Sequence, residues 1–416
     1  MSIAGIPGVE SADRTIVIGG FGAAGASLAL ALARGGVEPG AITVFDASPD
    51  SDQAPDKPDA RILALNAGSQ RYLKALGAWE KLADQAYPMR SIAISDTGLE
   101  ESIRPRLLDM QPEAEGGPLA HLVALGRLNH VLRGLCREAG IEVLKGRYGG
   151  STACSSAIDV QIGTETRRAR LLVGADGARS AIRTMAGIPV HGWPYGQTAI
   201  VATIRHSLPH HGEGAQHFLP SGPFALLPLD EYRSSIVWSE RAEKAAEILS
   251  ASPAERKRAI AARAAGWRGE ILDVEAVSSH PLQLALARRF VGERIALVAD
   301  AAHVVHPLAG QGLNLGFEDC AMLAELVVER LRAGLDPGAP DLLETYQARR
   351  RPAAAAMGYA MEGMNRLFSN DSGPLRMVRD LGVGLVNRMP GLKQRLMKAA
   401  SGQTGLSPRL FRGEAL

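Results

Sequence analysis

A glycine-rich turn near the start of the chain constrains the fold more than any other feature. Residues 15–19 (TIVIG) predict a buried strand, and residues 23–34 predict an alanine-rich helix. Between them Gly20, Gly22 and Gly25 form the pattern G-x-G-x-x-G. In such a unit the first glycine permits the tight turn, the second lets a pyrophosphate approach the backbone, and the third lets helix and strand pack closely. The pattern therefore predicts a dinucleotide site at one end of a parallel sheet.

The next strand completes this unit. Residues 41–45 (AITVF) are apolar, and Asp46 ends the strand twenty-one residues after Gly25. An acid at this place binds the ribose hydroxyl groups of a dinucleotide. A glycine turn of purely structural origin is the weaker interpretation once the acid is present, and the pattern alone does not distinguish FAD from NAD.

A second glycine-rich stretch lies between a strand and a helix late in the chain. The apolar run 295–299 predicts a buried parallel strand, and apolar residues at helical spacing over 317–331 predict a helix with Glu318 and Asp319 in its first turn. The glycines of residues 310–316 let backbone N–H groups approach a ligand at the positive end of that helix. We expect this stretch to hold an anion or a negatively charged ring edge.

Two further positions are candidates for ligand contact. Asp176 lies between glycines after a predicted strand (169–173) and can accept hydrogen bonds from ligand hydroxyl groups, with a ligand-free Asp-Gly turn as the alternative. Arg127 begins a predicted helix (127–139) and could pair with a phosphate or remain a solvated surface charge. The sequence does not decide between the two roles of Arg127.

The middle of the chain has a different pattern. Apolar runs joined by Pro/Gly turns, with no helix between them, predict an antiparallel sheet that forms a separate layer. These runs cover residues 198–204, 215–219, 224–229 and 234–239. Two helices are predicted after them, and residues 100–118, rich in Glu, Pro and Gly, predict a loop.

Composition excludes several classes of protein. With 46 Lys and Arg against 44 Asp and Glu the net charge is +2, so no nucleic-acid-binding surface is indicated. The three cysteines are scattered and lack metal spacing, which indicates unpaired thiols in a reducing compartment. Neither a signal peptide nor an apolar run of membrane-spanning length is evident. We therefore expect a cytoplasmic location.

Taken together, the three motif stretches resemble those of the single-component flavoprotein aromatic hydroxylases, the family that includes 4-hydroxybenzoate hydroxylase. GFGAAG with Asp46, GADGARSAIR (174–183) and ADAAHVVHPLAGQGLNLG (299–316) match the three FAD motifs of this family in order and spacing. Within the family, HPLAGQGLNLG and FLPSGPFALLPL (218–229) are most similar to the ubiquinone-biosynthesis hydroxylases. The family usually has glycine where this chain has Ala299, which puts close packing at that position in question.

The resemblance implies an α/β fold with three parts. These are a Rossmann-like FAD-binding domain of the GR2 flavoprotein type, an antiparallel-sheet substrate domain and a C-terminal helical segment. The implied limits are 1–75, 95–185 and 285–340 for the FAD-binding domain, 76–94 and 186–284 for the substrate domain, and 341–416 for the helical region.

The resemblance also implies an FAD-dependent monooxygenase. Such an enzyme takes electrons from NAD(P)H, forms a flavin C4a-hydroperoxide with dioxygen, and inserts one oxygen atom into the ring of a polyprenylated phenol. A ubiquinone-biosynthesis complex is an implied partner. No acid–base triad is expected, because the cofactor supplies the oxygenation chemistry. The resemblance implies that Gly20, Gly22 and Gly25 bind the pyrophosphate, that Asp46 binds the adenosine ribose, and that Asp176 lies in the groove near the pyrophosphate. Arg61 and Arg127 would contact the FAD, and Asp300 would bind its ribityl chain. Pro307 and Gly310 would pack near the isoalloxazine, and the backbone of Gly312, Leu313 and Asn314 would donate hydrogen bonds to its N1–C2=O edge.

Several alternatives remain at this stage. Asp300, His303 and His306 are residue types that bind metal ions, and they occur at regular spacing. They lack a cysteine partner or an H-E-x-x-H arrangement. The first glycine motif by itself would also suit an NAD-dependent dehydrogenase. Within the family, a hydroxylase of a soluble aromatic compound is the runner-up, and a non-catalytic FAD-binding scaffold of a biosynthetic complex is a further possibility.

The C-terminal part is basic. From Asn365 to Arg412 there are nine Lys and Arg against Asp371 and Asp380, so nine minus two leaves an excess of seven positive charges. Apolar residues alternate with these charges, and basic amphipathic helices suit an anionic lipid surface. A solvated helical cap or a protein–protein surface is equally consistent with the pattern. With a polyprenylated substrate, we expect peripheral association with the inner face of the cell membrane.

Overall fold

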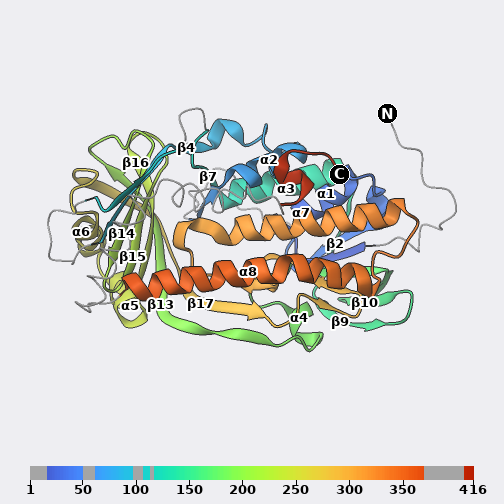
Figure 1. Ribbon diagram of the computed structural model, residues 1–416. Coiled ribbons are helices and arrows are strands. Elements are labelled where there is room, and N and C mark those ends of the chain that lie inside the picture. Colours follow the sequence, from blue (N-terminus) through green and yellow to red (C-terminus); the bar gives the residue numbers. More distant parts are fainter. Residues whose placement is uncertain (1–15, 50–60, 97–105, 113–116, 370–406) are drawn as a thin grey trace.

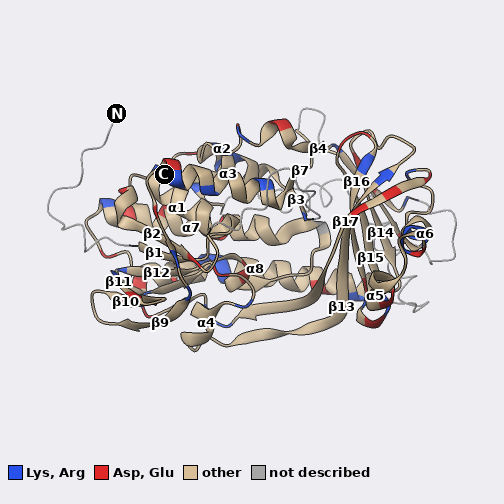
Figure 2. Cartoon of the chain, turned by 180° about the vertical axis from the view of Figure 1, so that it is seen from behind, with Lys and Arg blue, Asp and Glu red and all other residues tan. Residues whose placement is uncertain are grey.

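A computed structural model describes residues 16–49, 61–96, 106–112, 117–369 and 407–416 (Figure 1). Most of the basic C-terminal segment lies outside these residues. Within the described residues no helix is both long and apolar enough to cross a membrane. Acidic and basic side chains are intermixed over both halves of the molecule (Figure 2).

The N-terminal glycine unit lies at the centre of a six-stranded sheet. Its strands have the order β18-β19-β12-β1-β2-β8, and all neighbours are parallel except β18 and β19. Residues of β1, β12 and β19 are buried throughout, as expected for parallel strands covered on both faces. The strands are β1 (Ile16–Gly19), β2 (Ile42–Asp46), β8 (Glu142–Lys145), β12 (Leu171–Gly174), β18 (Val291–Gly292) and β19 (Ile295–Leu297).

Helices and a small meander cover this sheet. The helices α1 (Ala23–Arg34), α3 (Leu125–Glu138) and α7 (Gln311–Arg332) pack together on one side, and α1 has the limits predicted from the sequence. In Figure 1 the meander β9-β10-β11 and the short α4 lie on the other side. Their limits are β9 (Tyr148–Ala153), β10 (Ile158–Ile162), β11 (Glu165–Ala169) and α4 (Ala181–Met185).

The second half of the fold is an eight-stranded sheet with the order β20-β17-β13-β16-β15-β14-β5-β6. It is antiparallel, as predicted, except that β5 and β14 are parallel. Helices α5 (Ala242–Ser250) and α6 (Pro253–Ala264) lie against it. The strands are β5 (Ser91–Asp96), β6 (Leu108–Met110), β13 (Val190–His206), β14 (Glu213–Leu219), β15 (Gly222–Pro228), β16 (Arg233–Arg241), β17 (Ile271–Ala287) and β20 (His303–Val304).

In this region the sequence missed one strand, and one loop prediction is wrong. The sequence indicated no strand over residues 271–287, yet β17 pairs with β13 along most of its length. Register shifts interrupt that pairing, and Ala276 has φ of 51°, so the period-2 alternation that marks a strand is lost. The loop predicted for residues 100–118 contains β6, which pairs with β5.

A fourth, small sheet and short helices join the two halves. The sheet has the order β3-β7-β4 and is antiparallel, and α2 follows β3. The domain limits predicted from the sequence stay a prediction; β5 and β6 pair with each other although they fall on opposite sides of the limit at residue 95. These elements are β3 (Ile62–Leu65), β4 (Tyr87–Met89), β7 (Ala120–Ala124), α2 (Ala67–Ala75) and the 3-10 turns Pro39–Ala41, Ala83–Gln85, Ala299–Ala301 and Leu308–Gly310.

Two long helices pack together, and the second of them connects the halves. The helix α7 begins at Gln311, six residues earlier than predicted, because Gly310 adopts a left-handed conformation with φ of 62° and starts it. Glu318 and Asp319 are therefore the eighth and ninth residues of the helix and lie in its third turn, not in its first. The helix α8 (Pro340–Phe368) packs on α7 and reaches β17 and β15 of the eight-stranded sheet (Figure 1), and α11 (Arg409–Arg412) packs on α2 and α7.

The position where the chain departs from its family is conformationally unusual. Ala299 has φ of 53°, a region that favours glycine. Its neighbour across the interface is Gly316 of α7, where an added Cβ would lie 2.6 Å from the Ala299 Cβ and 3.1 Å from its Cα. The backbone therefore stores strain at Ala299, and its methyl group occupies the room that a side chain at residue 316 would need.

This contact predicts that substitutions at residues 299 and 316 affect stability in opposite directions and depend on each other. Gly316→Ala should lower the free energy of unfolding by about 1–3 kcal/mol, because the two methyl groups would overlap. Ala299→Gly should raise it by about 1 kcal/mol, and the double variant should regain most of the loss. Chemical denaturation of the four proteins measures these changes.

Gly363→Ala is the matched control. This exposed α8 residue has nothing within 4 Å of an added Cβ, so its effect should not depend on residue 299. Additive effects of Ala299→Gly and Gly316→Ala would contradict the proposed contact.

Candidate cofactor site

The three glycines of the first motif lie in different surroundings. Gly20 has φ of 104°, and a Cβ there would lie 2.3 Å from the Ala175 carbonyl oxygen. A Cβ on Gly25 would lie 2.0 Å from the Gly20 carbonyl oxygen. Gly22, the N-cap of α1, has φ of −77° and nothing within 4 Å of an added Cβ. The protein itself therefore requires glycine at residues 20 and 25 but not at residue 22, where open space faces a helix N-terminus.

Asp46 lies directly beside this turn. Its Oδ2 accepts a hydrogen bond from the Phe21 amide (2.8 Å), and its Oδ1 accepts one from the Ser48 amide (2.8 Å). Arg133 of α3 is buried and donates to the Phe21 carbonyl oxygen (2.7 Å). Sequence reasoning missed Arg133, because its role depends on α3 packing beside the glycine turn.

The backbone of Asp176 lies close to the same glycine turn, but its carboxylate binds residues at the start of α4. A Cβ on Gly20 would lie 2.9 Å from the Asp176 Cα. The carboxylate accepts hydrogen bonds from the Ser180 hydroxyl (2.5 Å) and from the amides of Ala181 (2.7 Å) and Ile182 (3.1 Å). Its oxygens thus cap α4, and the predicted place of Asp176 in the pyrophosphate groove stays a prediction.

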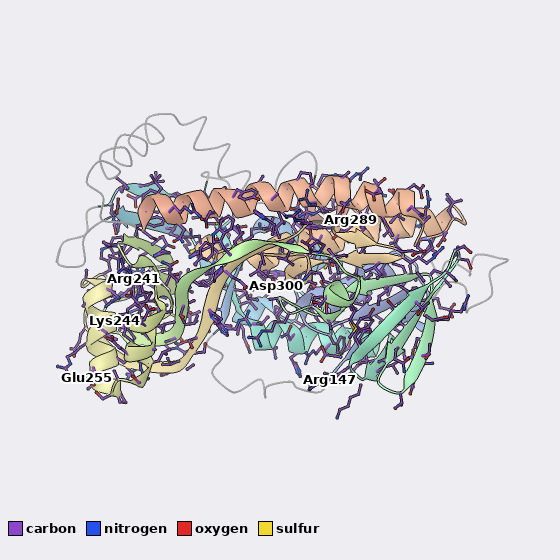
Figure 3. The ribbon with its side chains drawn as sticks, turned by 90° about the horizontal axis from the view of Figure 1, so that it is seen from below. Arg147, Arg241, Lys244, Glu255, Arg289 and Asp300 are labelled. Carbon is purple, nitrogen blue, oxygen red and sulfur yellow. The ribbon has the colours of Figure 1, made fainter. Side chains whose placement is uncertain are left out.

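Asp300 and Arg61 come from distant parts of the chain and interact electrostatically. Asp300 follows β19 in the 3-10 turn Ala299–Ala301, and Arg61 precedes β3. The Asp300 side chain is accessible to water, yet surrounding protein atoms raise the pKa of its carboxyl group, an effect that His303 and Arg61 oppose. An accessible acid among many protein atoms fits the wall of a recess. Figure 3 shows Asp300 between the two halves of the molecule.

A buried ionic network supports the turn that carries Asp300. Asp319 Oδ2 accepts hydrogen bonds from the Ala299 amide (3.1 Å) and from His303 Nε2 (2.6 Å), and its Oδ1 accepts one from Arg350 Nε (2.7 Å). Arg350 also pairs with Glu318 (3.0 Å). Burial would raise the pKa of Asp319, but the facing His303 and Arg350 lower it overall. Sequence reasoning missed this network, for which the only signal was a pair of acids in α7 and a run of arginines in α8.

The side chain of Asn314 holds the start of α7 in place. Its Oδ1 accepts hydrogen bonds from the Asn66 amide (3.1 Å) and the Ser69 hydroxyl (2.7 Å), and its Nδ2 donates to the Ala64 carbonyl oxygen (2.8 Å). The sequence predicted only a backbone role for this residue. Asn314 therefore fixes the N-terminus of α7 against β3 and α2.

The other residues at the start of α7 are of two kinds, those packed against protein atoms and one glycine with open space around it. A Cβ on Gly310 would lie 3.2 Å from the Ala64 Cβ, and Pro307 is the N-cap of the 3-10 turn Leu308–Gly310. Leu313 packs against the main hydrophobic core. At Gly312 an added Cβ meets nothing within 4 Å. Gly312 at the start of α7 therefore has open space around it, as Gly22 has at the start of α1.

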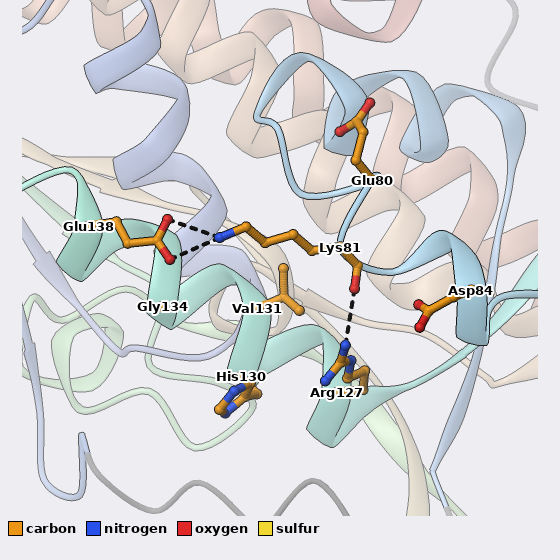
Figure 4. Close-up of a pocket in the computed structure, with 8 residues that line it drawn as sticks. All are labelled: Glu80, Lys81, Asp84, Arg127, His130, Val131, Gly134 and Glu138. Carbon is orange, nitrogen blue, oxygen red and sulfur yellow. Dashed lines mark hydrogen bonds and ion pairs between the residues drawn. The ribbon is translucent and has the colours of Figure 1, made fainter.

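Arg127 lies elsewhere, in a pocket of about 370 Å³ beside α3 (Figure 4). Its guanidinium donates to the Lys81 carbonyl oxygen (3.2 Å), and the Lys81 amine pairs with Glu138 (2.9 Å). Arg133, on another side of α3, is the residue that reaches the glycine turn. A contact between Arg127 and FAD stays a prediction. The pocket is lined by Glu80, Lys81, Asp84, Arg127, His130, Val131, Gly134 and Glu138.

The histidines of the late motif do not form a metal site with Asp300. His303 Nε2 is bonded to Asp319. Among the described residues no group of three or more His, Cys, Asp or Glu could hold a metal ion. His306 is fully buried, its ring contacts the Tyr195 ring edge-on at 5.1 Å, and neither of its nitrogens has a hydrogen-bond partner. Burial lowers the pKa of His306 to about 4.

This histidine predicts a loss of stability in mild acid. The ordinary pKa is 6.5, so between pH 6.5 and about 4 the unfolded chain binds a proton that folded His306 does not. Unfolding should become easier by about 1.4 kcal/mol per pH unit over this window, and the contribution should be constant above it. Urea denaturation from pH 7.5 to 4.5 measures the slope, which should be shallower in His306→Gln and unchanged in the exposed control His191→Gln. An equal slope in both variants would show that His306 does not titrate in this way.

Sequence comparison identifies a family and several relatives of this chain. Residues 13–359 match the FAD binding domain family. The chain is 40% identical to the ubiquinone hydroxylase UbiL of Rhodospirillum rubrum, covering 99% of this chain and 96% of that protein. It is 33% identical to the 3-demethoxyubiquinol 3-hydroxylase of Escherichia coli (93% and 98% covered) and 30% identical to the human ubiquinone biosynthesis monooxygenase COQ6 (93% and 92% covered).

Solved structures share the fold at low identity. The p-nitrophenol 4-monooxygenase PnpA of Pseudomonas putida superposes with a TM-score of 0.74 at 17% identity, covering 94% of this chain and 99% of that one. The Diels-Alderase PyrE3 superposes with a TM-score of 0.72 at 22% identity, covering 94% and 81%. The fold predicted from the sequence is therefore confirmed, and the chain belongs to the family of FAD-dependent aromatic hydroxylases, in the group represented by the ubiquinone-biosynthesis enzymes.

Proposed function

We propose that this protein hydroxylates the aromatic ring of a polyprenylated phenol in ubiquinone biosynthesis, with FAD as cofactor. One observation carries the cofactor part of this proposal. Gly22 and Gly312 both leave open space at a helix N-terminus, and no packing within the protein requires glycine at either place. A ligand that lies against both backbones explains both glycines. The names of the relatives support the substrate class.

FAD fits these residues. Gly20, Gly22 and Gly25 would hold its pyrophosphate at the start of α1, and Asp46 its adenosine ribose. Asp300, accessible to water yet surrounded by protein atoms, would bind the ribityl chain, and Arg61 would contact the FAD. The backbone of Gly312, Leu313 and Asn314 would donate to the N1–C2=O edge, where the N-terminus of α7 contributes about 0.3–2 kcal/mol towards holding a negative charge.

The protein has a positioning role in the reaction. Reduced FAD, when bound, activates dioxygen and supplies the oxygen atom that enters the ring. The Asp319 network holds the Asp300 turn, and Asn314 holds the start of α7, so neither has to reorganise during the reaction. NAD(P)H is the proposed electron donor and would bind only transiently, because the sequence has no second dinucleotide motif.

The fold alone does not establish this chemistry, because a Diels-Alderase shares it. A non-catalytic FAD-binding scaffold would purify with FAD but show no substrate-dependent consumption of oxygen. A hydroxylase of a soluble aromatic compound would respond to small phenols without a prenyl chain. Oxygen consumption by the purified protein with prenylated and unprenylated phenols therefore tests the proposal.

Loss of the Asp300 carboxylate should abolish FAD retention. Wild-type protein should purify with one FAD per chain, and Asp300→Ala should purify largely without it, because the ribityl hydroxyl groups lose their acceptor. Flavin absorbance per chain measures this. Asp109→Ala is the control, since Asp109 is an exposed acid that pairs with Arg106 on the surface. Stoichiometric FAD in Asp300→Ala would refute the assignment.

We also propose that the basic C-terminal segment binds anionic lipid. Deleting the C-terminal segment is a poor test, because the deletion would also remove Phe411 of α11, which packs against Tyr72 in the core. Charge removal is cleaner, and cosedimentation with anionic liposomes at low salt should fall at least about tenfold, since each cation near the surface contributes about 1 kcal/mol. The test variant replaces Arg376, Arg379, Lys393 and Arg395 by Gln, and the control replaces the exposed Lys74, Lys244, Arg258 and Arg289 by Gln. Equal binding by the two variants would show that this segment is not the anchor.

A further inference from the structure

Four buried polar atoms without a hydrogen-bond partner lie where α8 meets the late glycine-rich stretch. They are Tyr195 Oη, Glu362 Oε2 and both ring nitrogens of His306, and none makes a hydrogen bond within the described part of the chain. His306 is fully buried, and Glu362 is 6% exposed. Buried polar groups are nearly always hydrogen-bonded, and an ordered water is the usual partner where the protein supplies none. Such a concentration therefore indicates bound water.

Contacts join these three residues into one series. The rings of His306 and Tyr195 meet edge-on, with their centroids 5.1 Å apart. Tyr195 Oη makes no hydrogen bond to Glu362, but burial and then the Glu362 carboxylate raise the pKa of Tyr195, so the two groups lie close together. A short gap with polar atoms on both sides is one that a water molecule can bridge.

The two ends of this series have different surroundings. Glu362 pairs with Arg366 one turn further along α8, and the Arg366 side chain is 70% exposed and lies over the Trp193 ring. At the other end His306 directly precedes Pro307, which we expect near the isoalloxazine. The series thus extends from the molecular surface to the proposed flavin site.

An irregularity in β13 explains how Tyr195 reaches α8. The pairing of β13 with β17 is interrupted between Pro194 and Thr198, and Gly196 has φ of 66°. Such an interruption redirects side chains that regular alternation would otherwise point to one face or the other. Tyr195 therefore meets His306 and α8 instead of filling a regular position in the sheet.

The chemistry of the three side chains suits proton transfer. A carboxylate and a phenolic hydroxyl can each accept and release a proton. A neutral imidazole can accept a proton at one ring nitrogen while it releases the proton of the other, so no net charge stays in the core. Burial lowers the pKa of His306 to about 4, so the ring is neutral at pH 7, as this role requires.

We propose that Glu362, Tyr195 and His306, joined by bound water, carry protons from solvent to the proposed flavin site. This inference rests on the proposed function, in which a phenol, dioxygen, NAD(P)H and a proton yield the hydroxylated ring, NAD(P)⁺ and water. Glu362 takes a proton from solvent beside Arg366, and the Tyr195 hydroxyl passes a proton on. His306 receives it at one nitrogen and releases another from its second nitrogen. Each group regains the proton that it gives up, so the path returns to its starting state after every turnover.

Exchange of the His306 ring N–H proton with water tests this path. NMR of the FAD-loaded protein with ¹⁵N-labelled histidine measures the exchange rate, and the signal is identified by its loss in His306→Gln. The wild-type proton should exchange rapidly although the ring is fully buried. Tyr195→Phe and Glu362→Gln should each slow the exchange at least about tenfold, because a positioned proton-transfer group contributes about 10²–10⁴-fold, while FAD content stays unchanged.

Tyr359→Phe and Glu344→Gln are the matched controls, because both residues are exposed on α8. Wild-type exchange rates in both Tyr195→Phe and Glu362→Gln, or equal slowing in the controls, would overturn the inference. Either test variant suffices if the other folds poorly. If exchange slows as expected but no phenol is hydroxylated, the proton path stands and the proposed function fails. If phenols are hydroxylated and neither variant changes the exchange rate, the proposed function stands and the path fails.

Discussion

The carboxylate of Asp319 is the single group on which the arrangement of the site depends most. It joins the Ala299 amide, His303 and Arg350, and so ties the end of β19, α7 and α8 together in the core. A fully buried carboxylate is tolerated only when paired and hydrogen-bonded, and removing one partner of such a pair costs about 3–5 kcal/mol. Because α8 also reaches the eight-stranded sheet, the same ion pairs help to set one half of the molecule relative to the other.

The network also explains how the chain accommodates alanine where its family usually has glycine. A left-handed alanine costs about 1–2 kcal/mol, and such a conformation persists only where its surroundings hold it. Here the Ala299 amide donates to Asp319, and the methyl group fits only because residue 316 is glycine. The doubt raised by the sequence therefore has a structural answer, in which strain at one residue is offset by packing and an ionic anchor at others.

Local patterns were sufficient for much of the fold, but contacts between distant residues were not. The glycine turn, α1 and the buried parallel strands followed from short-range spacing, because each is determined by residues within one unit. β17 could not be predicted, because bulges and Pro281 remove its alternation and its pairing with β13 spans the whole substrate half. The FAD contacts predicted for Asp300, Arg61 and Arg127 stay predictions; Arg61 acts electrostatically on Asp300, and Arg127 lines the pocket beside α3. Arg133, Arg350 and the side chain of Asn314 were invisible to sequence reasoning, because their partners lie far away in the chain.

The starts of α1 and α7 show how the surroundings of a glycine refine a sequence motif. Gly20 has a positive φ, and an added Cβ at Gly20 or Gly25 would meet a carbonyl oxygen, so the protein itself requires glycine at both positions. Gly22 and Gly312 have open space around an added Cβ, so packing among the described residues requires glycine at neither. Open space alone does not indicate a ligand, because the exposed Gly363 of α8 has it too. Gly22 and Gly312 differ from Gly363 because they lie at helix N-termini, where backbone N–H groups lack intrahelical partners and attract anions, and this is why these two positions carry the cofactor proposal.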